Sequence, residues 1–175
     1  MHPFSLFKYC PKCGSPAFGE YDFKSKKCES CGFVYYFNSA ASTAAFILDG
    51  KNRLLVARRA KSPAQGTLDL PGGFVDLHET AEEAVLREIK EETSLNVDNP
   101  QYLFSLPNTY VYSGFEVHTV DLFYQIQVSG TPSVRAADDV SELFFLPIEQ
   151  LNPALFGLIS IRKGVEKWIE SILRK

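Results

Sequence analysis

The sequence predicts an α+β fold, arranged as a sandwich-like α/β/α domain behind a small cysteine-rich N-terminal unit. Apolar runs of strand length dominate the chain from about residue 40 to residue 146. Helical stripes of apolar residues occur near the middle of the chain and at its C-terminal end. Strands that predominate between two amphipathic helices favour a sheet covered by helices. We therefore expect two parts, residues 1–37 and residues 38–175 of the 175-residue chain.

The N-terminal unit contains all four cysteines of the chain, in two C-x-x-C-G motifs at residues 10–14 and 28–32. A unit of this size cannot bury a core of its own. Two disulfides or unrelated free thiols are the alternatives, and disulfides would require an oxidising compartment. Four thiolates in two such pairs are typical of a structural zinc site. Because sulfur would fill every position of the tetrahedron, we expect a metal that replaces the missing core and is not catalytic. The expected zinc ligands are Cys10, Cys13, Cys28 and Cys31.

Strands of the second part are expected first at residues 43–49 and 53–58, joined by a hairpin turn at residues 49–52. A short strand follows at residues 67–70, and Pro71, Gly72 and Gly73 end it. The remaining strands are expected near residues 102–106, 116–128 and 143–146, with a polar loop at 129–139.

Two helices complete the expected fold. Thr80 and Glu83 have the spacing of a capping box, which predicts a helix from about Thr80 to Thr93. Apolar residues repeat along this helix at i, i+4 and i+8 and should face the sheet. The second helix is expected from about Ser160, with an apolar stripe of Ile161, Val165, Trp168, Ile169 and Ile172.

The first helix carries three glutamates, Glu88, Glu91 and Glu92, within five residues. Glu88 and Glu92 project within about 40° of each other on an ideal helix, on the face that also carries Val85. Like charges at i, i+4 repel each other, and negative charge near a helix C-terminus opposes the macrodipole. A divalent cation with oxygen ligands, Mg²⁺ or Mn²⁺, would resolve this conflict. A solvated acidic helix is the alternative.

Residues 73–95 resemble the Nudix box, G-x5-E-x7-R-E-U-x-E-E-x-G-U, in which U is a bulky apolar residue; Ser94 replaces the last glycine. The resemblance implies a Nudix α/β/α sandwich with a mixed sheet and a metal-dependent pyrophosphohydrolase. It implies that Glu88 and Glu92 are the principal magnesium or manganese ligands and that Glu91 is a further one. The Gly72 carbonyl would complete the shell. Arg87 and Glu79 would hold the loop against the helix by a salt bridge.

A zinc ribbon ahead of a Nudix domain resembles the NADH pyrophosphatase family, which cleaves the diphosphate of NAD(H); some members remove NAD caps from RNA. The family motif S-Q-P-W-P-F-P-x-S is altered here, because only Ser105 and Pro107 match it. ADP-ribose and FAD therefore stay open as substrates beside NADH and NAD. A metal-binding acid of that family corresponds to Asp139, with Glu142 as the competing candidate.

Aromatic residues after the box are candidates for stacking a base, since aromatic faces suit planar rings. They are Tyr110, Tyr112 and Phe115, with Phe74 beside the glycine turn as another; core packing is the alternative. Arg58 and Arg59 end a strand and could contact substrate phosphate. Glu116 and Asp121 are weaker candidates for a catalytic acid.

The net charge of −3 argues against broad binding of nucleic acid, except at a capped RNA end. We see no apolar run of about 20 residues and no secretory leader, so a cytoplasmic protein without membrane contact is expected. The resembled family also implies a possible homodimer. A rival hypothesis makes the chain a binding module, with a nucleic-acid- or protein-binding ribbon and a Nudix ligand sensor. Lys24, Lys26 and Lys27 in the ribbon would serve that role.

Overall fold

The computed structural model describes residues 4–174, which divide between Ser39 and Ala40 into two compact units. The first unit is an antiparallel sheet of three short strands, which the sequence did not predict, in the order β1 (Phe18–Asp22), β2 (Ser25–Cys28) and β3 (Val34–Tyr36). Its buried cluster consists of Cys10, Phe18 and Cys28. So small an apolar cluster cannot stabilise a fold alone.

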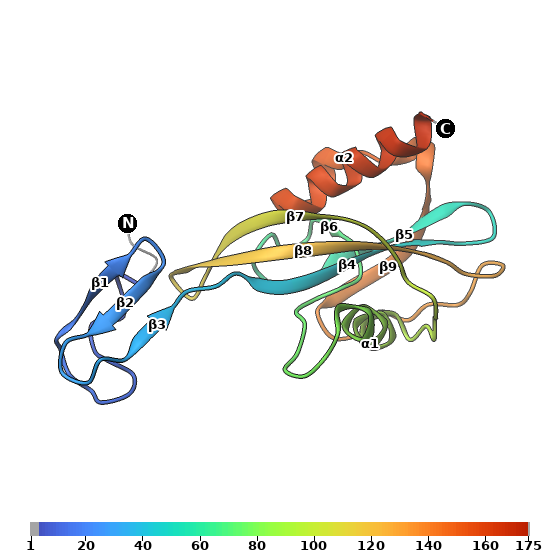
Figure 1. The fold of residues 1–175 in the computed structure, drawn as a ribbon. Helices are drawn as coiled ribbons and strands as arrows, with labels where there is room; N and C mark the ends of the chain where they lie inside the picture. Colours follow the sequence, from blue (N-terminus) through green and yellow to red (C-terminus); the bar gives the residue numbers. More distant parts are fainter. Residues whose placement is uncertain (1–3, 175) are drawn as a thin grey trace. The chain divides into compact units, whose positions relative to one another are not determined.

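The second unit contains a six-stranded sheet (Figure 1). Its strands run in the order β6-β5-β4-β8-β7, and β9 pairs with β5. The pairing of β4 with β8 is parallel and the other pairings are antiparallel, so the expected mixed sheet is confirmed. The strands are β4 (Ala40–Leu48), β5 (Arg53–Arg59), β6 (Leu68–Asp69), β7 (Gln101–Tyr112), β8 (Phe115–Gln127) and β9 (Val140–Pro147).

Helices α1 (Ala81–Thr93) and α2 (Ile159–Leu173) cover opposite faces of this sheet (Figure 1). Alternation along β4 sets the two layers, because successive side chains of a strand point to opposite faces. Ala45 and Ile47 pack with α1 in one cluster, whereas Phe46 packs with α2 in the other. The α/β/α sandwich is confirmed. Two short 3-10 turns, Ile148–Gln150 and Pro153–Leu155, precede α2.

Both ends of α1 follow from local chemistry. The Thr80 hydroxyl accepts from the Glu83 N–H, and the Glu83 carboxylate accepts from the Thr80 N–H, so the predicted capping box is present. At the other end Ser94 adopts a left-handed conformation with φ of 62°, and its N–H donates to the Lys90 carbonyl. Serine therefore keeps the turn that glycine would make more easily.

Strand β7 extends beyond the predicted residues 102–106 to Tyr112. Proline cannot donate to a β-ladder, so Pro107 is unusual within a strand. In the structure β7 is an edge strand, so Pro107 pairs with Val120 on one side without breaking the ladder. No helix in residues 4–174 is long and apolar enough to cross a bilayer.

Candidate active site

Two glycines bring a loop against both β4 and α1. At Gly72, with φ of 146°, a Cβ would lie 2.2 Å from the Thr43 carbonyl oxygen. At Gly73 a Cβ would lie 2.5 Å from a carboxylate oxygen of Glu88. The Gly73 carbonyl accepts from the Thr43 N–H at 2.7 Å, which ties the loop to the sheet. At Gly72 only glycine allows the loop to pass this close to the backbone of β4, whereas at Gly73 the neighbour is the movable end of the Glu88 side chain.

Arg87 joins the same loop to α1 from the other side. Its Nε and Nη2 donate to the two oxygens of Glu79 at 2.8 and 2.9 Å, and Nη2 also donates to the Phe74 carbonyl at 3.0 Å. The Arg87 hydrogen bonds hold the pKa of Glu79 down at about 2. A bidentate pair of this kind fixes direction as well as distance. Arg87 also contacts Glu88 at 2.8 Å and Glu91 at 3.1 Å.

Glu92 is the buried acid of the helix, with 8% of its surface exposed. Its Oε2 accepts from the Gly72 N–H at 2.9 Å. Burial raises the pKa of the Glu92 carboxyl to about 8, although the Gly72 hydrogen bond favours the ionised form. Burial likewise raises the pKa of Glu88, against the effect of Arg87. A cation beside these carboxylates would favour their ionised forms.

The oxygen ligands of Glu88, Glu91 and Glu92 suit a hard cation such as Mg²⁺ or Mn²⁺. Among residues 4–174, the cysteines are the one group of metal-binding side chains gathered within 4.8 Å; these glutamates are not so gathered. Glu88 and Glu91 reach toward Arg87, and Glu92 toward Gly72. Shared coordination would therefore require rotation of side chains, for which the exposed Glu91 has the most freedom.

A cavity of about 300 Å³ lies beside this loop. That volume is at the lower end of the range usual for small-molecule sites. The lining includes acids, aromatic side chains and one arginine. These residues include Gly72, Gly73, Glu92, Asp139, Phe74, Tyr110, Tyr112, Arg59, Asn108 and Asp121.

Half of the sequence-derived candidates meet at this cavity, and the others do not line it. Those that line it are Gly72, Phe74, Glu92, Tyr110, Tyr112, Arg59, Asp121 and Asp139. Those outside the lining are Glu79, Arg87, Glu88, Glu91, Phe115, Glu116, Arg58 and Glu142. Arg58 donates from Nε to Glu142 at 2.9 Å, and neither residue lines the cavity. The adjacent Arg59 does, and it pairs with the buried Asp69. Neighbouring side chains of a strand point to opposite faces of the sheet, so Arg58 and Arg59 point in opposite directions although they are adjacent in sequence. Asp139 lines the cavity and pairs with Lys61. Burial raises the pKa of the Tyr110 hydroxyl.

The side chain of Asp121 is held by three hydroxyl groups, a network that sequence reasoning missed. Ser42 and Thr119 each donate to Oδ1 at 2.5 Å, and Ser160 donates to Oδ2. The donors come from β4, β8 and α2, so their meeting depends on tertiary packing. Only 4% of the Asp121 surface is exposed. Strand alternation around Asp121 was the one signal in the sequence that could have marked it.

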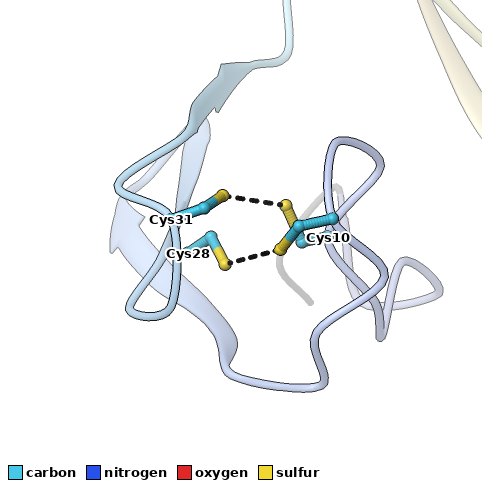
Figure 2. A group of neighbouring side chains, drawn as sticks. Cys10, Cys28 and Cys31 are labelled. Atoms are coloured by element: carbon cyan, nitrogen blue, oxygen red, sulfur yellow. Dashed lines mark hydrogen bonds between the residues drawn. The ribbon is translucent and has the colours of Figure 1, made fainter.

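The four cysteines gather in the first unit, as Figure 2 shows for Cys10 facing Cys28 and Cys31. The Sγ atoms of Cys10 and Cys31 are 3.8 Å apart, and those of Cys13 and Cys28 are 3.7 Å apart. A zinc tetrahedron with Zn–S bonds of about 2.3 Å has edges of roughly 3.8 Å. The glycines after each pair, Gly14 and Gly32, have φ near 70°, as the motifs predicted. The cluster fits a zinc ribbon.

Comparison with known proteins identifies the second unit. The family described as NUDIX domain matches residues 38–169.

The chain belongs to the Nudix family.

Two curated relatives extend this result. An ADP-ribose pyrophosphatase of Methanocaldococcus jannaschii is 34% identical over 124 residues, which cover 70% of each chain. An NAD-capped RNA hydrolase NudC of Stutzerimonas stutzeri is 27% identical over 162 residues, which cover 91% of this chain and 54% of the relative. The chain thus spans about half the length of the bacterial Nudix relative.

Solved structures show the same fold. A NUDIX hydrolase from Nitrosomonas europaea has a TM-score of 0.71 at 17% identity, covering 94% of this chain and 91% of its own. The NUDIX domain of Shewanella oneidensis NrtR, crystallised with ADP ribose, has a TM-score of 0.64 at 19% identity, covering 78% and 90%. The Nudix relatives that are named for hydrolysis favour the enzyme over the binding module.

Proposed function

We propose that this chain hydrolyses the diphosphate linkage between a nucleoside and a second group, in a substrate of the ADP-ribose, NAD(H) or FAD kind, and releases two monophosphates. One observation carries the proposal. A single cavity is lined both by the Gly72–Gly73 turn with Glu92 and by the aromatic residues Phe74, Tyr110 and Tyr112. The first set suits a metal-bound diphosphate and the second a planar base.

The catalytic cation would be held by Glu88, Glu91 and Glu92, with the Gly72 carbonyl as a further ligand. When bound, Mg²⁺ or Mn²⁺ supplies charge neutralisation on phosphate oxygens and lowers the pKa of a bound water. The protein's own residues position the substrate diphosphate. Arg87 and Glu79 hold the glycine loop so that the diphosphate has one place to lie.

Four other cavity residues complete the proposed site. Arg59 would contact a substrate phosphate, since it lines the cavity and arginine matches phosphate geometry. Asp139 would supply the further acid. It already lines the cavity, and its exposed ion pair with Lys61 can be given up at little cost. Tyr110 and Tyr112 would stack the base or the nicotinamide ring.

The zinc ribbon has a structural role in this proposal. Sulfur–sulfur distances close to a tetrahedral edge support a zinc ion bound by all four cysteines. A homodimer and a cytoplasmic location stay predictions. Sedimentation or light scattering would test the first, and cell fractionation the second.

Product analysis tests the proposed reaction. The full chain is incubated with NADH, NAD, ADP-ribose, FAD, diadenosine polyphosphates and NAD-capped RNA, each with Mg²⁺ or Mn²⁺. We expect AMP, or the corresponding RNA monophosphate end, together with a second monophosphate from at least one substrate. The proposal would be contradicted if monophosphates were still released after the divalent metal was chelated. It would also be contradicted if no phosphate ester product formed from any substrate.

A further inference from the structure

The sheet face that carries the α2 layer changes from apolar to polar where the cavity begins. On β4, Ala44 and Phe46 belong to the apolar core, whereas Ser42 lines the cavity. On β8, Phe123 belongs to the same core, whereas Asp121 and Thr119 line the cavity. Residues two apart share a face, so these polar side chains continue the core stripes of both strands. A buried polar row is costly unless it has a purpose in packing or binding.

Strand register gathers this polar row into one surface. Ser42 of β4 lies opposite Asp121 of β8, and Thr119 of β8 lies opposite Asn108 of β7. All four residues line the cavity. We call them the polar floor: Ser42, Asn108, Thr119 and Asp121. The cavity lining also includes the aromatic side chains of Phe74, Tyr110 and Tyr112.

The hydrogen bonds already present in the polar floor determine which donors and acceptors remain for a ligand. Ser42 and Thr119 use their hydroxyl protons on Asp121, so their remaining capacity is as acceptors. An ionised carboxylate is an acceptor as well, with room for about four hydrogen bonds, and three are occupied. The side-chain Oδ1 of Asn108 accepts from the Thr109 N–H, whereas Nδ2 of the same amide donates to no side chain or backbone atom of residues 4–174. The floor thus combines free acceptor sites around Asp121 with one amide donor.

A role for Asp121 in holding the start of α2 does not by itself explain the hydrogen bonds around its carboxylate. The N-cap residue of α2, Leu158, provides no side-chain cap, and the Ser160 hydroxyl bonds to Asp121 Oδ2. That contact explains one oxygen of the carboxylate. The other oxygen is fixed by two hydroxyls that line the cavity, and a buried carboxylate is a costly means of holding a helix end.

We propose that Asp121 and Asn108 read the base of the substrate: Asp121 accepts from an exocyclic amino group of a purine, and Asn108 donates to the adjacent ring nitrogen. This inference rests on the proposed function and names the base that the cavity selects. Adenine presents an amino donor beside an acceptor nitrogen. Hypoxanthine presents an oxo acceptor beside an N–H donor, so both contacts would become repulsive. A site that leaves buried polar groups unpaired with the wrong ligand discriminates strongly.

Comparison of ADP-ribose with IDP-ribose tests the proposal. In the wild type we expect kcat/KM to be about 10- to 100-fold higher for ADP-ribose, as hydrogen bonds to a charged group imply. Asp121→Asn offers an amino group to the oxo atom of hypoxanthine, so the preference should fall below about threefold or invert. Asn108→Ala should also reduce it, and serves if Asp121→Asn fails to fold.

The matched control is Asp49→Asn. Asp49 is also a buried, hydrogen-bonded carboxylate, but it does not line the cavity. This variant should lose stability and keep the wild-type preference. Equal use of the two substrates by the wild type would overturn the proposal. So would an unchanged preference in Asp121→Asn and Asn108→Ala, which would leave Asp121 a purely structural residue.

Two further measurements distinguish failure of the base-recognition proposal from failure of the proposed hydrolase activity. If a ribose hydroxyl occupies the polar floor, removal of the adenosine 2′-hydroxyl will lower kcat/KM and the amino group will not matter, which contradicts the proposal. Calorimetry measures the affinities for AMP and IMP without requiring turnover. Preference for AMP by a chain that hydrolyses nothing would uphold base reading and refute the proposed activity. Hydrolysis with equal affinity for AMP and IMP would do the reverse.

Discussion

The backbone N–H of Gly72 donates to Glu92 Oε2 at 2.9 Å, although the two residues lie 20 positions apart. This contact joins the glycine turn to the acidic helix beneath it. It also leaves one carboxylate oxygen of Glu92 free of any hydrogen bond within residues 4–174. The free oxygen belongs to a residue that lines the cavity.

Glu92→Gln should therefore remove activity without removing the fold. The amide oxygen of glutamine can still accept from Gly72, whereas the negative charge that holds a cation is lost. We expect kcat/KM to fall by about 100-fold or more, with an unchanged circular dichroism spectrum. The control is Glu166→Gln, at an exposed position of α2, which should keep wild-type rates. Near-normal turnover of Glu92→Gln with Mg²⁺ or Mn²⁺ would refute the assignment.

Ser94→Gly should stabilise the protein. Ser94 ends α1 with φ of 62°, a left-handed conformation that costs an L residue about 1 kcal/mol more than glycine. The extra freedom of glycine in the unfolded chain offsets part of the gain, so we expect about 0.5 kcal/mol from urea unfolding. Ser94→Ala should not stabilise the protein, because alanine is also an L residue and bears the same cost of the left-handed conformation. A glycine variant less stable than the wild type would show that Ser94 makes a compensating contact.

Asp49 should make stability depend on acid pH. Burial disfavours its charge, but hydrogen bonds from the Arg53 side chain and from the N–H groups of Arg53 and Lys51 outweigh burial and hold the pKa of Asp49 well below its usual value. A lowered folded-state pKa contributes stability above the unfolded pKa of about 3.9, and this is lost as pH falls further. The difference in urea midpoint between wild type and Asp49→Asn should be steady from pH 7 to about pH 5 and should shrink as the pH falls from about 4 to 3, with the rest lost nearer the folded-state pKa. A difference that stayed constant over the whole range would contradict this account.

Zinc removal should unfold the first unit and spare the second. The two units have separate buried clusters, and the cysteines are most of the first. We expect one zinc per chain by elemental analysis, and loss of amide protection in residues 4–39 after chelation. Residues 40–174 should keep their protection. Cys28→Ser should reproduce the effect at neutral pH. Full protection of both units without zinc would exclude a structural metal.

The elements that local chemistry specifies could be predicted from the sequence. Helix α1 is one, because its capping box and apolar repeat are complete within the segment itself. The turn at Gly72 and Gly73 is another, since a proline followed by two glycines ends a strand. The cysteine motifs likewise carry their own turn geometry.

Features that depend on distant partners could not be predicted. Asp121 gains its network from Ser42 and Ser160, which lie 79 and 39 residues away. The choice between Arg58 and Arg59 depends on the phase of β5 against β6 and β9, which a run of apolar residues does not reveal. The length of β7 depends on its edge position, which permits Pro107.

The central claim is that Glu88, Glu91 and Glu92 bind the cation that acts on the diphosphate. The most direct test is a crystal structure with Mn²⁺ and a methylene analogue of ADP-ribose that resists cleavage. We predict manganese anomalous density between these carboxylates and the phosphonate oxygens, with the base beside Asp121. A well-ordered analogue in the cavity with no manganese at the helix would contradict the account.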